Sequence, residues 1–517
     1  MTASKLPLTR RSLVKGAAAT SLLGTMLAAR RAPAQSAGER PLIVNGIQSG
    51  DVSGGNAVIW SRCDRPARMI VDYATTESMA NAQRAVSPAV LETSDFTAKV
   101  ELEGLPAGQT VFYTVSFEDL ANPGVMSEPA RGRLRTPGTG DITFTWSGDT
   151  AGQGWGIDES RGGMTIYETM RTHNPDFFLH SGDTIYADGP LKEEVTLVDG
   201  TIWQNLVTPE KTKVAETLAE YRGNYRYNLL DANVRTLAAE VPMLVQWDDH
   251  ETLNNWYPGE MLLADERYTV KSSSLLAANS RQAFFEYMPI RTDPSGAMRI
   301  ERVIRRGAML DIFFLDMRTN RGPNTPNREE IETPFLGADQ LAWLKRELLS
   351  SNATWKAIAS DMPIGLLVPD GETDFEAVGN GDGPALSREL EIARLLRFIR
   401  DNAIRNVVWF TADVHYTAAH RYDPTAAKFT EFAPFWEFVS GPLNAGTFGP
   451  NGLDNTFGPQ VVYQKAPAEG QVNLPPSDGL QFFGHVRIDG ASQVMTVTLR
   501  DAADNALWSI DLEPERA

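Results

Sequence analysis

Hydrophobic and polar positions follow two different patterns along the chain, and the pattern changes near residue 138. Before that point, short segments rich in β-branched and aromatic residues partly alternate apolar with polar positions; they span 58–62, 67–73, 96–102 and 110–117. Gly, Pro and Ser turns separate them, and no strong helical period lies between them. This pattern is typical of a β-sandwich. We therefore expect an all-β domain of the immunoglobulin or fibronectin type at residues 35–137.

From residue 138 onwards, continuous apolar runs alternate with stretches of helical period. The stretch 340–349 places Leu341, Leu344 and Leu348 on one face of a helix, and 388–401 shows the same period. Strands that alternate with helices form layered domains. Alternating strands return near the C-terminus. We therefore expect an α/β (α+β layered) domain over residues 138–517.

An aspartate follows each of six apolar runs in this second domain. These residues are Asp149, Asp183, Asp249, Asp316, Asp361 and Asp413. Ligands of open α/β sheets bind outside the carboxyl ends of the strands, so we expect these carboxylates to converge on one edge. A single aspartate after a strand is more simply interpreted as a turn or helix cap. Their repetition, with His250 and His415 close by, favours a metal site.

The candidate ligands combine carboxylates with a phenol and an imidazole. They are Asp149, Asp183, Tyr186, Asp248, Asp249, Asp413 and His415. Hard cations prefer oxygen ligands, and imidazole suits transition metals. Two metals about 3.5–4 Å apart share a bridging ligand and take terminal ligands on either side. The set is large enough for such a pair.

Charge and cysteine content narrow the possible partners. The net charge is −18, and Cys63 has no cysteine to pair with. An acidic surface argues against a nucleic-acid scaffold and against an anionic membrane surface. It does not exclude an anionic substrate, because bound metals invert the local field.

The first 34 residues have the features of an export signal. They contain six basic residues and no acidic one, so their removal would take the net charge from −18 to −24. Arg10 and Arg11 precede a small, apolar stretch over 16–29, and Ala32-Pro-Ala34 offers a cleavage site. We interpret residues 1–34 as a twin-arginine signal peptide, with an ordinary Sec signal as the alternative. The twin-arginine (Tat) export machinery is then a partner, and the protein is periplasmic or secreted. No later run approaches the roughly 18 apolar residues of a membrane anchor.

Four motifs in this order resemble one family. They are Ser147-Gly-Asp149, Ser181-Gly-Asp183-Thr-Ile-Tyr186, Trp247-Asp-Asp-His-Glu251 and Asp413-Val-His415. Together they look like the PhoD-type alkaline phosphatases of the calcineurin-like metallophosphoesterase superfamily, and the resemblance covers nearly all of the mature chain. It implies that a metallophosphoesterase sandwich domain follows the β domain in the chain. It also implies that the protein is an exported hydrolase of phosphate esters.

The resemblance also implies roles for individual residues. Asp183 would bridge two metals, and Tyr186 would bind a ferric ion as phenolate. Asp249, assisted by Asp248, would bind the second metal, and Asp413 and His415 would complete the shell. His250 would contact the phosphoryl group or protonate the leaving oxygen, and Asn254 is a weaker candidate for a metal or substrate contact. The implied ions are Fe³⁺ and Ca²⁺, with Zn²⁺ or Mn²⁺ as alternatives.

One position departs from the family pattern. Typical members carry a cysteine near the end of the first strand as an iron ligand, whereas this chain has Ser147-Gly-Asp149 there and its single Cys63 in the β domain. We expect Asp149 to take the place of the thiolate. This exchange makes the donor harder and leaves the iron and calcium assignment open.

The implied reaction is metal-assisted hydrolysis, in which the metals lower the pKa of a bound water and the hydroxide attacks phosphorus in line. Arg161, in the Gly-rich loop after Asp149, would clamp the phosphate; the alternative is a solvated loop arginine. Two other functions stay open. One is a phosphodiesterase, including a phospholipase-D-like hydrolase, and the other is an exported metal-binding protein without catalysis.

Overall fold

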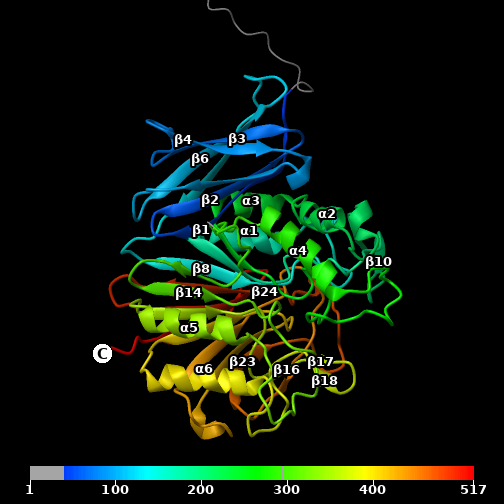
Figure 1. Cartoon of the computed structure of the whole chain (residues 1–517), viewed down its shortest axis with the longest axis vertical. Coiled ribbons are helices and arrows are strands. Elements are labelled where there is room, and N and C mark those ends of the chain that lie inside the picture. Colours follow the sequence, from blue (N-terminus) through cyan, green and yellow to red (C-terminus); the bar gives the residue numbers. More distant parts are fainter. Residues whose placement is uncertain (1–39, 294, 517) are drawn as a thin grey trace, which may run out of the picture. The chain divides into compact units, whose positions relative to one another are not determined.

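The computed structural model describes residues 40–293 and 295–516, so the predicted signal peptide lies outside the described part of the chain. Two large sheets form the centre of the described residues (Figure 1). The first has nine strands in the order β26 (Ala506–Leu512), β25 (Met495–Asp501), β24 (Phe482–Ile488), β8 (Ile142–Ser147), β9 (Phe177–Ser181), β12 (Met243–Gln246), β1 (Ile43–Ser53), β2 (Asn56–Cys63) and β5 (Thr97–Leu102).

The second sheet has seven strands. Their order is β13 (Arg302–Arg305), β14 (Leu310–Phe314), β15 (Trp355–Ala359), β19 (Val407–Thr411), β21 (Phe435–Val439), β20 (Thr417–Tyr422) and β23 (Pro459–Lys465). Aromatic and branched side chains of both sheets, such as Phe144, Leu179, Phe314 and Phe410, form one buried cluster. The two sheets therefore pack face to face.

Helices cover the outer faces of this pair of sheets. The nine-stranded sheet carries α1 (Thr165–Thr172), α2 (Leu218–Asn228), α3 (Ala232–Glu240) and α4 (Ser273–Tyr287). The seven-stranded sheet carries α5 (Ala338–Ser350) and α6 (Glu389–Asp401), through side chains that include Leu344 and Leu396 (Figure 1). The layered α/β architecture predicted from the sequence is confirmed. Within residues 40–293 and 295–516, no helix is long and apolar enough to cross a membrane.

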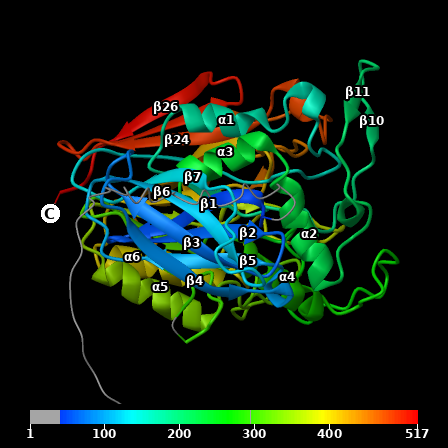
Figure 2. The ribbon, with the colours of Figure 1, turned by 90° about the horizontal axis from the view of Figure 1, so that it is seen from above.

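The N-terminal strands form the predicted all-β sandwich. A four-stranded sheet of β4 (Gln83–Val90), β3 (Ala67–Ala74), β6 (Thr110–Asp119) and β7 (Ala130–Arg135) packs against β1, β2 and β5, and Figure 2 looks down on it. Gly50 of β1 also pairs in parallel with Met243 of β12. The sandwich therefore continues the central sheet through hydrogen bonds, while the domain boundary near residue 137 stays a prediction.

Three small ribbons complete the strands. They are β10 (Glu194–Thr196) with β11 (Ile202–Gln204), β16 (Leu366–Leu367) with β22 (Gly452–Leu453), and β17 (Pro369–Asp370) with β18 (Asp374–Phe375). The first of these extends away from the sheets in Figure 2.

Parallel pairing places the carboxyl ends of the central strands together. β8, β9 and β12 run parallel in the first sheet, and β14, β15 and β19 run parallel in the second. Each of these six strands is the predicted apolar run that precedes an aspartate. Main-chain bonds join neighbouring ends, from the amide of Asp149 to the carbonyl of Gly182 at 3.3 Å and from that of Ala412 to the carbonyl of Asp361 at 2.8 Å.

Close packing between β24 and β8 gives a test of this core. Gly484 lies opposite Trp146, and a Cβ at residue 484 would lie 1.9 Å from the indole. We expect Gly484→Ala to lower the free energy of unfolding by about 1–3 kcal/mol, because the buried indole cannot move without repacking. Thermal and urea unfolding would measure the change. Gly140→Ala is the control, since a Cβ there meets no atom within 4 Å; equal stability of the two variants would contradict the packing argument.

Candidate metal centre

The candidate ligands lie in the tight loops that follow β8, β9, β12 and β19. Four of these residues have a left-handed backbone: φ is 68° at Asp149, 53° at Asp183, 67° at Asp413 and 61° at His415. Residues other than glycine adopt this conformation at a cost of about 1–3 kcal/mol each, and such strain gathers at functional sites. The backbone of these loops is therefore strained, and the strained conformation sets the direction of the ligand side chains.

Gly182, which directly precedes Asp183, occupies a position that requires glycine. Its φ is +104°, and a Cβ there would lie 2.5 Å from Cβ of Asp248. The loop after β9 thus crosses the loop after β12 at a distance that only glycine permits. This close approach brings Asp183 beside the Asp248–Asp249 pair.

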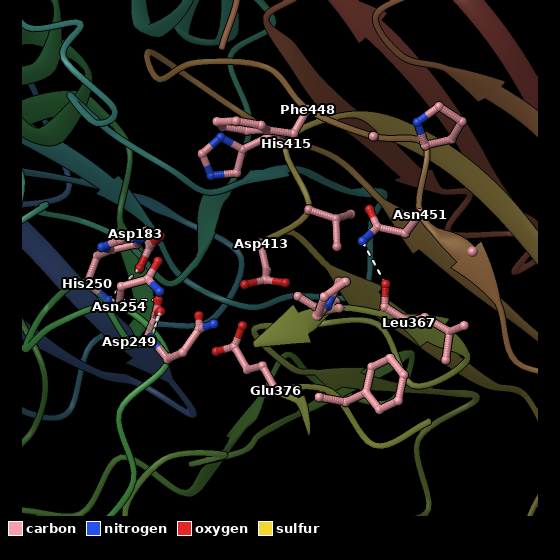
Figure 3. A pocket seen from close by; sticks show the side chains of 18 of the residues that line it. Asp183, Asp249, His250, Asn254, Leu367, Glu376, Asp413, His415, Phe448 and Asn451 are labelled. Atoms are coloured by element: carbon pink, nitrogen blue, oxygen red, sulfur yellow. Dashed lines mark hydrogen bonds between the residues drawn. The ribbon is translucent and has the colours of Figure 1, made fainter. Parts of the chain in front are cut away.

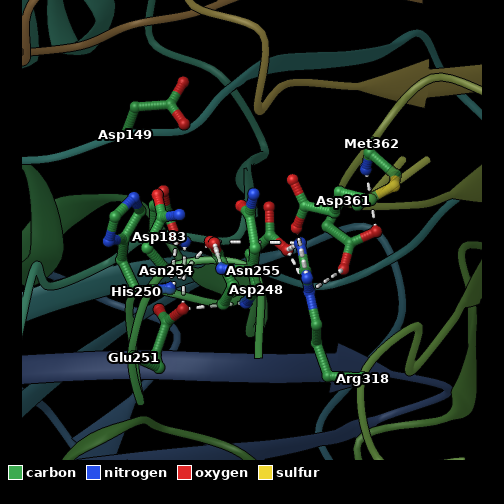
Figure 4. A network of polar contacts seen from close by, with 12 residues as sticks. Asp149, Asp183, Asp248, His250, Glu251, Asn254, Asn255, Arg318, Asp361 and Met362 are labelled. Atoms are coloured by element: carbon green, nitrogen blue, oxygen red, sulfur yellow. Dashed lines mark hydrogen bonds and ion pairs between the residues drawn. The ribbon is translucent and has the colours of Figure 1, made fainter. Parts of the chain in front are cut away.

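Three groups of ligand atoms lie close together among the described residues. Each group has its atoms within 4.8 Å of one another, and the groups are Asp149 with Asp183 and His415, Asp183 with Asp249 and His250, and Asp248 with Asp249 and Asp413. Asp183 belongs to the first two groups, and Asp249 to the last two. Figures 3 and 4 show these side chains converging from the two sheets. The strand-end carboxylates therefore form one continuous cluster.

Tyr186 and His415 complete one end of this cluster. The hydroxyl of Tyr186 lies 2.8 Å from Nε2 of His415, which is 3.5 Å from Oδ1 of Asp149. Nδ1 of His415 donates to the carbonyl of Gly446, which can only accept, so Nε2 carries the lone pair. Burial lowers the pKa of His415 to about 4. The imidazole is therefore neutral and presents a ligand atom to its neighbours.

Burial and mutual repulsion act on the carboxylates. Burial raises the pKa of Asp149, and the carboxylates of Asp249 and Glu251 raise it further. Burial likewise raises the pKa of Asp183 and of Asp413, each beside other carboxylates. The charge of His250 lowers the pKa of Asp149 and the charge of Arg318 lowers that of Asp413, but neither outweighs burial, so further positive charge is needed to keep these groups ionised.

Several carboxylate oxygens have no hydrogen-bond partner among the described residues. They include both oxygens of Asp149 and one each of Asp248 and Asp413. Buried oxygens without donors are costly unless a cation binds them. Oxygen atoms from carboxylates and a phenol, with an imidazole nitrogen, are also a chemically suitable ligand set. The residues present therefore fit a metal centre.

Two charged residues that the sequence analysis gave no role hold the cluster in place. Glu251 accepts hydrogen bonds from the main-chain amides of Asp183 at 3.1 Å and Asp248 at 2.8 Å, and so joins the two loops. Arg318 is fully buried and donates to Oδ1 of Asp248 at 2.6 Å (Figure 4). It also forms an ion pair with Glu376. Arg318 follows β14 in residues 315–321, a segment that resembles the family but whose resemblance assigned the arginine no role, whereas Glu251 belongs to the Asp-Asp-His-Glu motif.

Asp188 was also missed, and it orients His250. Its Oδ1 lies 2.7 Å from Nδ1 of His250, and its Oδ2 accepts from the amide of Asn254 at 2.9 Å. Burial alone would lower the pKa of His250, but the carboxylates of Asp188 and Asp249 outweigh it and raise that pKa to about 10. The imidazole thus has one nitrogen fixed by Asp188, which leaves Nε2 for other contacts. The short spacing from Tyr186 to Asp188 was the only signal in the sequence.

The structure does not bring Arg161 to this cluster, contrary to the sequence-based expectation. Its guanidinium lies 3.3 Å from Asp158 and 5.5 Å from the ring centre of Trp203, and it donates to the carbonyl of Ile202. The Gly-rich loop after β8 turns towards β11 before it reaches Arg161. The side chain is therefore held on the neighbouring ribbon.

A cavity of about 600 Å³ opens onto the cluster (Figure 3). Asp183, Asp249, His250, Asp413 and His415 all line it. None of the described residues that line it is Lys or Arg. Any anion that enters therefore meets carboxylates, amides and two imidazoles, of which His250, with its raised pKa, carries the positive charge.

Comparison with known proteins agrees with this geometry. Residues 144–499 match the family model described as PhoD-like phosphatase, and residues 28–138 match that of the PhoD-like phosphatase N-terminal domain. Alkaline phosphatase D of Bacillus subtilis (strain 168) is 25% identical over 446 residues, which cover 82% of this chain and 72% of that protein.

Two solved structures share the fold. A structure of PhoD superposes with a TM-score of 0.66 at 20% identity over 92% of each chain. The purple acid phosphatase PPD1 from yellow lupin (Lupinus luteus) seeds gives a TM-score of 0.55 at 11% identity, over 92% of this chain and 74% of that one. With the family model spanning most of the sequence and the acidic cluster at the strand ends, the chain belongs to the PhoD-like phosphatases and is a phosphoric ester hydrolase of the alkaline phosphatase D type.

Proposed function

We propose that this hydrolase is exported and depends on metal ions held by the strand-end cluster. The observation that carries the proposal is the set of buried carboxylate oxygens without hydrogen-bond partners, in a cluster that lines a cavity large enough for a phosphate ester. When bound, a pair of cations supplies an activated water and offsets the negative charge of the phosphoryl oxygens.

The donor types suggest which ion each end of the cluster holds. Asp149, Asp183, Tyr186 and His415 would hold one ion, and a ferric ion suits them because it can stabilise a phenolate. Burial, followed by the charges of Asp183 and Asp149, raises the pKa of Tyr186 well above its usual value, so only a strongly charged cation would ionise it. Asp183, Asp249 and Asp413, with Asp248 beside them, offer oxygens alone, which suits Ca²⁺.

The chain's own residues would handle the ester. His250 lines the cavity with Nδ1 held by Asp188, so Nε2 is the nitrogen that can contact the phosphoryl group or pass a proton to the leaving oxygen. Asn254 lines the same wall and is fixed through its amide by the same Asp188. One carboxylate therefore positions both polar contacts.

Elemental analysis of the protein purified without chelator or added metal tests the ions. We expect about one iron and about one calcium ion per chain, and a visible phenolate-to-iron absorption that Tyr186→Phe removes. Tyr221→Phe, which alters another buried phenol, is the control and should keep the absorption. Zinc or manganese without the absorption would contradict the ferric phenolate, and activity that survives removal of all metal would contradict the proposal itself.

Asp188→Asn tests the positioning of His250. The amide keeps the shape but not the charge, so we expect kcat to fall by about 10- to 100-fold with little change in KM. Metal content measured in parallel shows whether the cluster stays intact. Asp199→Asn is the matched control, because Asp199 only caps an exposed turn at Thr201. A kcat equal to that of the control would remove Asp188 from the mechanism.

Replacing the arginine pair tests export. With Arg10 and Arg11 both changed to Lys, a twin-arginine signal should fail, and the folded phosphatase should accumulate in the cytoplasm. Cell fractionation and activity in each fraction measure this. Replacement of Arg30 and Arg31 is the control, since they lie outside the motif. Unchanged export of the Arg10/Arg11 variant would favour the ordinary Sec signal.

A further inference from the structure

The cavity at the metal cluster has two chemically different walls. The acidic wall carries Asp183, Asp249 and His250. The apolar wall comes from the β16–β18 region, with Leu367, Val368 and Phe375, and from the 448–452 loop, with Phe448 and Pro450. Figure 3 shows Leu367 on the side opposite Asp249 and His250, and Phe448 beside His415. A substrate that places phosphorus at the metals must extend along apolar side chains.

Side-chain packing and main-chain hydrogen bonds hold the apolar wall in place beside the metal cluster. The ring of Phe448 packs edge-on against His415 with 5.4 Å between ring centres. Leu367 pairs with Gly452 across the β16–β22 ribbon, and Nδ2 of Asn451 donates to the carbonyl of Leu367 at 2.8 Å. Leu367, Val368, Phe375 and Phe448 are half-buried, so part of each remains available for contact. The wall is therefore a preformed apolar surface that begins next to a candidate metal ligand.

Among the described residues, this wall offers no cationic side chain to a second anionic group. Arg318 and Arg321 are buried but do not line the cavity, and both pair with Glu376. Glu376 itself lines the cavity and is negative when ionised. A distant phosphate or carboxylate would lose its hydration there without gaining a counter-charge.

We propose that the substrates carry a single phosphoryl group on an uncharged, apolar alcohol, aryl or alkyl, that lies against Leu367, Phe375 and Phe448. This inference rests on the proposed function, because it takes the metal cluster as the place where phosphorus binds. Polyphosphorylated compounds are then poor substrates. The apolar wall discriminates between phosphate esters by their alcohol, whereas the chemistry at phosphorus is the same for every ester.

A series of n-alkyl phosphates from ethyl to hexyl tests the proposal on the metal-loaded enzyme, because these esters share a nearly identical leaving group. We expect kcat/KM to rise about threefold per methylene while the alkyl chain covers the wall. Hexane-1,6-diol bisphosphate, which adds only a second phosphate, should have a kcat/KM at least about tenfold below that of hexyl phosphate.

Leu367→Lys places a cation in the apolar wall. We expect it to flatten the alkyl series and to raise kcat/KM for the bisphosphate relative to hexyl phosphate. Leu349→Lys makes the same change on an exposed residue of α5 and should keep the wild-type slope. Inhibition of the wild type by n-alkylphosphonates gives a second measurement that needs no variant, with inhibition constants falling along the series.

Two results would overturn the inference: a flat alkyl series in both hydrolysis and inhibition, or a bisphosphate hydrolysed as well as hexyl phosphate. The failure of the proposed function looks different. In that case, hydrolysis would persist after complete metal removal, whatever the slope of the alkyl series. The inference about the alcohol is therefore tested by the alkyl series and the bisphosphate, whereas the proposed function is tested by metal removal.

Discussion

The compensation of buried negative charge is the constraint on which the rest of this structure depends. The buried carboxylates around the cluster are each at most 2% exposed, and they include Asp149, Asp183, Asp248, Asp249, Glu251, Asp361 and Glu376. Arg318 and Arg321 are the guanidiniums buried among them. Each uncompensated buried ion costs several kcal/mol, and these two guanidiniums, even together with the imidazolium of His250, are fewer than the buried carboxylates. This shortage of positive charge explains why carboxylate oxygens remain without partners. Metal ions are the simplest groups that would supply the missing charge.

The architecture supplies the rigidity that this arrangement requires. Loops that place Asp149, Asp183 and Asp413 in left-handed conformations would relax if their ends could move. They start from parallel strands that are buried on both faces, between the shared core and the covering helices. Glu251 then ties the loops after β9 and β12 together through their amides. Strand pairing thus stabilises the ends of these loops and maintains their strained backbone at the site.

Much of this was predictable from local patterns, and the rest was not for identifiable reasons. The apolar runs before Asp149, Asp183 and Asp413 gave the strands and their convergence, because parallel strands end on one edge. β1 escaped detection, since polar residues and glycines at Gly46 and Gly50 interrupt its pattern. Arg318 lies in a segment that resembles the family, but nothing local in the sequence shows that its guanidinium is buried among the strand-end carboxylates. Arg161 was misplaced because sequence proximity to Asp149 says nothing about the direction in which the loop turns.

The proposed replacement of the family's thiolate by Asp149 would have consequences for the whole first end of the cluster. The single thiol, Cys63, is buried in the sandwich, where burial raises its pKa to about 11, so the chain has no thiolate to offer a metal. With Asp149, the first end of the cluster presents oxygens from Asp149, Asp183 and Tyr186 and only one nitrogen, from His415. Such a set favours harder ions than a thiolate would. The carboxylate also adds negative charge next to Asp183, which strengthens the demand for a highly charged ion. If Tyr186 binds a metal as we propose, this exchange would favour a highly charged ion there.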